Sequence, residues 1–293
     1  MKPPPFEYFA PATLDEALAL MAEHGYDAKA LAGGQSLIPM MNFRLAQPEI
    51  LVDLNNISEL AYIRPSDDGG VLIGAMTRHR MVERSPLIAE RAPLIYETMP
   101  KIATEQVRNR GTFGGSLAHA DSSAELVAVS VALNARFRIR SQEGERWVSA
   151  KEFFISLFTT ILEPEELVVE IAFPPMPERS GWSIKETARR PHDFALTGVV
   201  AMLTLDNENH CQQVKLVYLS AGDGPMEGCQ AAETLKGQPL TAETIQAAAE
   251  IAASADIDPS NDVHATAEYR RHLAKVLTYQ ALKEAFERAI SNN

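Results

Sequence analysis

Apolar and polar positions alternate along the chain in runs that predict both helices and strands. A capping box of Thr13 and Glu16 predicts a helix that ends at Gly25. Short apolar runs predict five strands, and helical spacing predicts two further helices: strands at 28–32, 50–54, 71–74, 136–140 and 167–173, helices at 92–103 and 124–133. Ser122 with Glu125 predicts a second capping box before the last of these helices.

The prolines at 174, 175 and 177 cannot continue a strand ladder, so a domain boundary is predicted there. Beyond it the pattern predicts an antiparallel meander and two helices: strands at 183–187, 199–205 and 214–219, helices at 242–253 and 265–289. We therefore expect an α+β protein with domains at 1–176 and 177–293.

Composition and charge exclude several classes of protein. A net charge of -12 repels phosphate backbones and anionic membranes, so no nucleic acid partner is expected. Cys211 and Cys229 are the only cysteines, too few for a disulfide framework or a thiolate metal site, which favours a reducing cytoplasm. No signal peptide or membrane-spanning run is visible. No histidine spacing or nucleophile arrangement predicts a metal site or catalytic residues.

Two glycine pairs carry the candidate chemistry. Gly33-Gly34 follows a predicted strand and precedes Ser36, and Gly114-Gly115 lies in a predicted loop that leads to a helix. Glycines let main-chain N–H groups approach a phosphate, so the two segments could hold a pyrophosphate from two sides, although each alone also fits a tight turn. Neither has the spacing of a Rossmann turn or a nucleotide-hydrolase phosphate loop.

The segments 32–37 (AGGQSL) and 106–121 (QVRNRGTFGGSLAHAD) resemble the medium FAD subunit of the xanthine dehydrogenase and carbon monoxide dehydrogenase family. Lys185 and the segment 189–195 (RRPHDFA) resemble that family's C-terminal domain. The resemblance implies an FAD-binding domain of the vanillyl-alcohol-oxidase (PCMH) type with subdomains at about 1–56 and 57–176, and a smaller α+β C-terminal domain with an antiparallel sheet and helices.

The resemblance also implies a set of FAD-binding residues: Ala30, Leu31, Ala32, Gly33, Gly34, Gln35, Ser36, Leu37, Ile102, Thr112, Phe113, Gly114, Gly115, Ser116, Asp121, Glu125, Val168 and Lys185. Phe113 replaces a commoner aliphatic residue. Three roles stay open. His119 binds FAD or a backbone group, Asp121 contacts FAD or fixes a turn, and Lys185 tunes the flavin or pairs with Glu186 or Asp193.

The implied function is that of an oxidoreductase subunit that passes electrons from the iron-sulfur clusters of a partner through FAD to an external acceptor. The molybdenum cofactor and two-iron two-sulfur clusters are expected in a large and a small partner subunit, assembled as a dimer of heterotrimers. Two alternatives remain: a stand-alone flavin oxidoreductase of the same fold, and a scaffold subunit without flavin.

Overall fold

The computed structural model describes residues 2–292, which begin with a small sheet of parallel strands in the order β1-β3-β2. Helix α1 packs its buried face on this sheet, and the predicted capping box of Thr13 and Glu16 is formed. The elements of this first subdomain are β1 (Glu7–Phe9), α1 (Leu14–His24), β2 (Ala28–Leu31), α2 (Leu37–Asn42) and β3 (Ile50–Asp53). Because β2 and β3 are parallel, the chain leaves both strands at the same edge.

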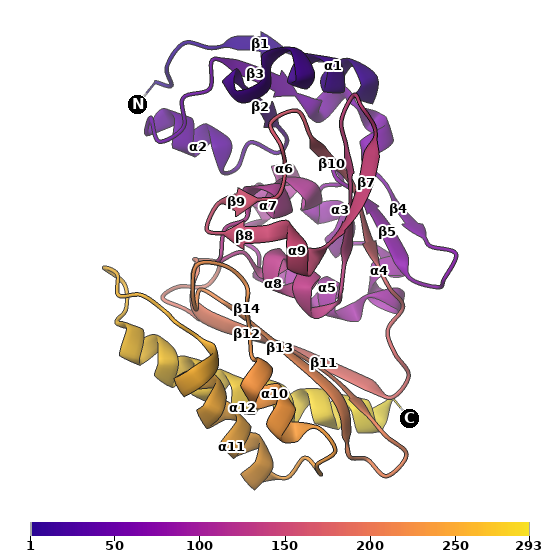
Figure 1. Cartoon of the computed structure of the whole chain (residues 1–293), viewed down its shortest axis with the longest axis vertical. Helices are drawn as coiled ribbons and strands as arrows, with labels where there is room; N and C mark the ends of the chain where they lie inside the picture. Colours follow the sequence, from indigo (N-terminus) through magenta and orange to yellow (C-terminus); the bar gives the residue numbers. More distant parts are fainter. Residues whose placement is uncertain (1, 293) are drawn as a thin grey trace.

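The second subdomain is a five-stranded antiparallel sheet in the order β4-β5-β10-β6-β7, with helices packed on it (Figure 1). Its strands are β4 (Ile63–Pro65), β5 (Val71–Gly74), β6 (Arg136–Arg140), β7 (Glu145–Ser149) and β10 (Leu167–Phe173), beside a two-stranded ribbon of β8 (Phe154–Ser156) and β9 (Thr159–Thr160). Its helices are α3 (His79–Glu83), α4 (Pro86–Arg91), α5 (Pro93–Thr98), α6 (Glu105–Arg110), α7 (Phe113–His119), α8 (Glu125–Ala132) and α9 (Ala150–Phe153).

Three sequence predictions in this subdomain are wrong in detail. The helix predicted at 92–103 is shorter: it starts at Pro93, which keeps Ala92 out of the helical region, and after Thr98 it continues only as a 3-10 helix over Met99–Lys101. The second glycine pair lies in helix α7 rather than in a loop. Ser122 does not cap α8. That helix starts after Ala124 without a side-chain cap.

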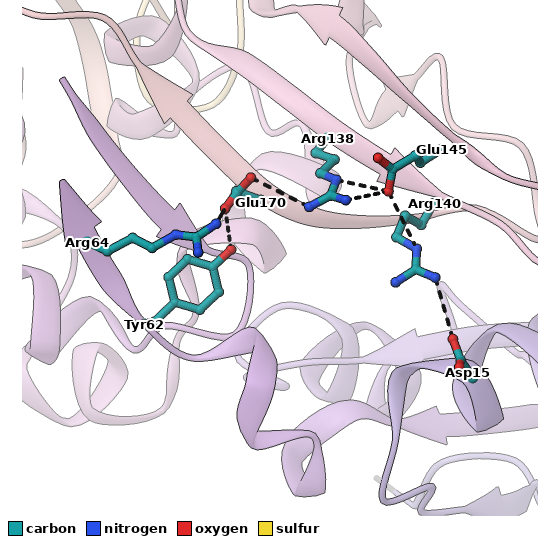
Figure 2. A network of polar contacts seen from close by, with 7 residues as sticks. All are labelled: Asp15, Tyr62, Arg64, Arg138, Arg140, Glu145 and Glu170. Atoms are coloured by element: carbon teal, nitrogen blue, oxygen red, sulfur yellow. Dashed lines mark hydrogen bonds and ion pairs between the residues drawn. The ribbon is translucent and has the colours of Figure 1, made fainter. Parts of the chain in front are cut away.

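A polar network joins the two subdomains along one side of the five-stranded sheet (Figure 2). Glu170 on β10 is only 3% exposed, and it accepts hydrogen bonds from the Tyr62 hydroxyl at 2.5 Å and from Arg64 at 2.7 Å. At the other end of the network, Arg140 on β6 forms an ion pair of 3.5 Å with Asp15 on α1. The carboxylate of Glu170 is therefore buried but has partners, as a buried charge requires.

The C-terminal domain is an antiparallel sheet in the order β11-β12-β13-β14, as the meander pattern predicted. Its elements are β11 (Ser180–Ala188), β12 (Ala195–Leu205), β13 (Cys211–Leu219), β14 (Met226–Glu227), α10 (Cys229–Leu235), α11 (Ala242–Ile251) and α12 (Ala267–Ser291). The three helices cover one face, and α5 and α8 of the second subdomain pack toward the other (Figure 1). Every residue of β12 is buried, because both faces of that strand are covered.

Within residues 2–292, no helix is long and apolar enough to cross a membrane, and no group of three potential metal-ligating side chains was found. The α+β architecture of a two-part first domain and a helix-covered antiparallel sheet agrees with the predicted fold class.

Candidate functional site

The first glycine pair forms a loop at the carboxyl end of β2. Gly34 has φ +73°, in the left-handed region where glycine is favoured. The main-chain N–H groups of residues 33–36 have no acceptor among the described residues, and Gln35 and Ser36 are exposed. Successive unpaired N–H groups around a left-handed residue form an anion-binding concavity.

The second glycine pair has a different role from the one that its composition predicted. Thr112 caps helix α7, and its hydroxyl accepts from Gly115 N at 3.2 Å. Phe113 N donates to the carbonyl of Thr77, and Gly114 N donates to the carbonyl of Ala75. The N–H groups in this turn therefore already have partners, and the unpaired N–H groups lie in the first loop.

The two segments nevertheless lie against each other, although about 80 residues separate them in the sequence. A Cβ atom on Gly33 would lie 2.5 Å from the carbonyl oxygen of Arg110, and one on Gly115 would lie 3.2 Å from the Cβ of Ala32. Only residues without side chains permit this approach. We call the segments 32–37 and 112–116 together the cradle.

The cradle fits the diphosphate of FAD. Its first loop offers four unpaired N–H groups to a dianion, and the hydroxyl groups of Ser36 and Ser116 add possible donors. The half-buried guanidinium group of Arg78 adds positive charge beside both segments, as described below. Ala30 and Leu31, the remaining predicted members of the first segment, form the end of β2 and lead directly into the loop.

Three of the other predicted residues are buried in the hydrophobic core of the second subdomain. Ile102 is 8% exposed and Val168 is 7% exposed. Phe113 is fully buried and packs edge-on against Phe173, with ring centroids 5.8 Å apart. Phenylalanine in place of the commoner aliphatic residue at position 113 therefore changes the packing of the core, and its side chain does not face a ligand.

Asp121 and His119 lie at the end of α7 away from Gly115. The Asp121 carboxylate accepts from Ser123 N at 2.8 Å, which supports the alternative that it fixes the turn. Asp121 also lines a cavity of about 300 Å³ between the two domains. The His119 ring packs on Phe158, with centroids 4.9 Å apart, and burial lowers its pKa.

Glu125 begins helix α8 at the face where that helix approaches the C-terminal sheet. Burial, and to a lesser extent the nearby carboxylate of Glu186, raise the pKa of Glu125 to about 7. The pKa of Glu186 is raised by burial as well. These two acids meet at the domain interface, and only Glu125 was predicted from the sequence.

Lys185 is not brought to the cradle. Successive residues of β11 point to opposite faces of the sheet. Lys185 lies on the face covered by α12 and forms an ion pair with Glu284, whereas Glu186 faces the second subdomain, where it meets Glu125. The alternative partners Glu186 and Asp193 were therefore wrong, because the partner comes from a helix almost a hundred residues further along the chain.

Sequence reasoning missed two residues that hold the cradle together, Asn55 and Arg78. Asn55 follows β3, and its side chain donates to the carbonyl of Ala32 at 2.9 Å. Arg78 donates to Asn55 and to the carbonyl of Arg110. The polar residues directly after the 50–54 strand were the available signal, because parallel strands that share an edge bring their following loops together.

The chain matches two family models, described as the FAD binding domain in molybdopterin dehydrogenase over residues 4–176 and the CO dehydrogenase flavoprotein C-terminal domain over residues 182–285. The 6-hydroxypseudooxynicotine dehydrogenase complex subunit alpha of Paenarthrobacter nicotinovorans is 41% identical over 99% of this chain and 97% of that protein. The carbon monoxide dehydrogenase medium chain of Hydrogenophaga pseudoflava is 38% identical over 98% of this chain and 99% of that protein.

Solved structures agree with these sequence matches. A carbon monoxide dehydrogenase structure from Hydrogenophaga pseudoflava superposes with a TM-score of 0.94 at 38% identity, covering 98% of this chain and 99% of that one. Quinoline 2-oxidoreductase from Pseudomonas putida 86 gives 0.93 at 36% identity, covering 99% of this chain and 100% of that one.

Proposed function

This chain belongs to the family of FAD-binding medium subunits of molybdenum hydroxylases, and on that premise we propose that its cradle binds the FAD diphosphate. The observation that carries the proposal is the loop of four unpaired N–H groups at the end of β2, directly against the start of α7. The N–H groups bind the phosphates, and the glycine contacts fix the spacing of the two segments. The side chains of Ser36 and Ser116 supply further donors.

Bound FAD supplies the redox chemistry, taking up electrons and releasing them to an acceptor. The protein's contribution is to bind and orient the cofactor and to set the charge around it. Glu125 and Glu186 place two acids with raised pKa values near the domain interface, and we propose that Glu125 lies near the flavin. Ile102 and Val168 support the site from the core. No residue of this chain is assigned a catalytic role.

Substrate selection is proposed to belong to a partner subunit. The relatives named above belong to enzymes of 6-hydroxypseudooxynicotine, carbon monoxide and quinoline, yet each is similar to this chain over nearly its whole length. A chain that keeps one fold across such different substrates does not itself select them. We propose a large molybdenum subunit and a small iron-sulfur subunit as partners, assembled as a dimer of heterotrimers in the cytoplasm, where the free thiols Cys211 and Cys229 would remain reduced.

The proposal is tested on the complete chain isolated with its partners. We expect one FAD per chain, and loss of that FAD in Gly34→Val, because a branched side chain at φ +73° strains the loop that carries the unpaired N–H groups. Gly224→Ala is the matched control, since a Cβ there meets no atom within 4 Å. Normal FAD content in Gly34→Val would refute the cradle.

The same preparation separates the alternatives. The absence of FAD from the unaltered complex would favour a scaffold subunit. Turnover of an organic substrate by this chain alone would favour a stand-alone oxidoreductase. Native mass spectrometry of the complex gives the subunit ratio, and a ratio other than two copies of each of three subunits would contradict the proposed dimer of heterotrimers.

A further inference from the structure

Asn55 is held rigidly at the edge of the first sheet. Asp53, the last residue of β3, caps the short turn that follows, and its carboxylate accepts from Asn55 N at 2.9 Å and also from the Asn55 side chain. The second oxygen of Asp53 accepts from the Tyr8 hydroxyl on β1 at 2.5 Å. The Asn55 amide therefore has one orientation, with its nitrogen toward Ala32 and its oxygen outward.

The outward oxygen of Asn55 accepts from Arg78 Nη2 at 2.5 Å, and Arg78 Nη1 donates to the carbonyl of Arg110. Ala32 begins the first segment of the cradle, and Arg110 lies two residues before Thr112. A continuous path of three hydrogen bonds thus runs from one segment to the other through two side chains. One acceptor carbonyl, that of Ala32, belongs to the first segment, and the other, that of Arg110, lies just before the second.

The backbone next to Arg78 holds the second segment as well. Arg78 forms an antiparallel bridge with Thr112, and His79 N donates to the carbonyl of Gly111 at 3.0 Å. The Arg78 side chain is therefore anchored to the second segment at its base and reaches across to the first. This geometry distinguishes it from a surface arginine whose position is set by solvent.

Arg78 forms no direct ion pair within the described part of the chain. Among residues 2–292 no carboxylate lies within ion-pair distance of its guanidinium group, which donates only to neutral oxygens. Burial and the neighbouring Arg110 lower the pKa of Arg78, and the carboxylate of Asp53, which lies beyond ion-pair distance, only partly opposes this shift. A half-buried, unpaired cation beside an anion-binding loop favours a phosphate ligand.

We propose that Asn55 and Arg78 act as a positioning pair that fixes the separation of the two cradle segments and adds a positive charge for the FAD diphosphate. This inference rests on the proposed function of the cradle. Two residues outside both glycine motifs then keep the two segments at the distance that FAD binding requires. Neither residue has a role in electron transfer itself.

The experiment measures FAD affinity and release rate in the complete chain after mild removal of the flavin, by titration with FAD and flavin fluorescence. Arg78→Met removes both hydrogen bonds of the guanidinium group and its charge, and since one charge-assisted hydrogen bond alone corresponds to about 10- to 100-fold in affinity, FAD binding should weaken by at least that much. Arg78→Lys keeps the charge but not both hydrogen bonds, so its affinity should be intermediate, with the salt dependence of the unaltered chain. Arg78→Met should lose part of that salt dependence, since screening acts on the charge.

Asn55→Asp tests the other half of the pair with a change of one atom. The new carboxylate still accepts from Arg78 but no longer donates to Ala32 or to Asp53, whose carboxylate now repels it, so FAD should be released faster and thermal stability should fall. The double variant Asn55→Ala/Arg78→Met should bind FAD no more weakly than the weaker single variant, because the two residues act in series. Arg91→Met is the matched control, since Arg91 also donates to carbonyl groups, those of Gly69 and Gly70.

The outcomes are separable. Unaltered FAD affinity and release in both Arg78→Met and Asn55→Asp would overturn the positioning pair, while loss of FAD in Gly34→Val would leave the cradle standing. Retention of FAD in Gly34→Val as well would overturn the cradle itself. If Arg78→Met fails to fold, Asn55→Asp decides alone: unchanged FAD release overturns the pair, and faster release supports it.

Discussion

The contact between the two cradle segments is open to a direct test through Gly33→Ala. The added methyl group would lie 2.5 Å from the carbonyl oxygen of Arg110 and 2.8 Å from the Cα of Gly111, both main-chain atoms that cannot rotate away. Gly33 itself is not in the left-handed region, so alanine introduces no backbone strain of its own. The variant therefore separates the segments and changes little else.

The magnitude follows from the geometry. Carbon contacts are most favourable at about 3.5 Å, so the segments must move apart by roughly half an ångström or more. Overpacking of this kind costs about 1–3 kcal/mol of folding stability. If the displacement also breaks one hydrogen bond to a phosphate, FAD binding weakens by a further 1.5–3 kcal/mol, or about 10- to 100-fold.

The assay is FAD titration of the flavin-free chain, together with thermal unfolding with and without FAD. Gly224→Ala serves as the control, because its new methyl group meets no atom within 4 Å. An FAD dissociation constant for Gly33→Ala within twofold of the unaltered chain would show that the spacing of the two segments does not govern binding, and the reasoning from loop contact would fail.

Three other variants test the surroundings of the site. Glu125→Gln should stabilise the fold at pH 8 but not at pH 5. The folded-state pKa of Glu125 is raised from 4.5 to about 7, so its contribution to folding stability is present below pH 4.5 and is lost as the pH rises through 7. The two limits differ by up to about 3 kcal/mol in the free energy of unfolding. Equal effects of the substitution in denaturant titrations at pH 5 and pH 8 would contradict this. Glu170→Ala should cost about 1–3 kcal/mol in urea unfolding, because it leaves the half-buried hydroxyl of Tyr62 without its acceptor. A loss below about 1 kcal/mol would show that the network in Figure 2 carries little stability. Lys185→Ala removes a partly exposed ion pair with Glu284, so we expect a loss of under about 1 kcal/mol and an unchanged flavin midpoint potential; a downward shift in potential would instead place Lys185 beside the flavin ring.

Strand positions were predicted well for strands whose apolar side chains are buried, because burial is visible directly in the sequence pattern. The predicted runs at 71–74, 136–140 and 167–173 coincide with β5, β6 and β10. These are central or covered strands, whose apolar side chains report burial directly. Short edge strands such as β1 and β4 were missed, because three residues are too few to show a period.

Predictions from local sequence patterns were wrong where a residue or backbone group makes a different contact in the folded structure. The glycine pair at 114–115 has the composition of a loop, but Thr112 caps it into a helix and the close approach of Ala75 requires glycine at 114. Ser122 and Glu125 have the spacing of a capping box, yet the turn before α8 is fixed by Asp121. The spacing of side chains shows which caps and turns are possible, and tertiary packing determines which of them form.

The sequence by itself determined the fold class, most of the central elements and the two glycine motifs, because burial periodicity and backbone freedom are local properties. Only the tertiary structure decided that the motifs touch, that the unpaired N–H groups all belong to the first of them, and that Asn55 and Arg78 join the two. It also decided that Glu186 rather than Lys185 faces the FAD domain, because the face of a strand reverses at every residue and only packing selects which face is covered.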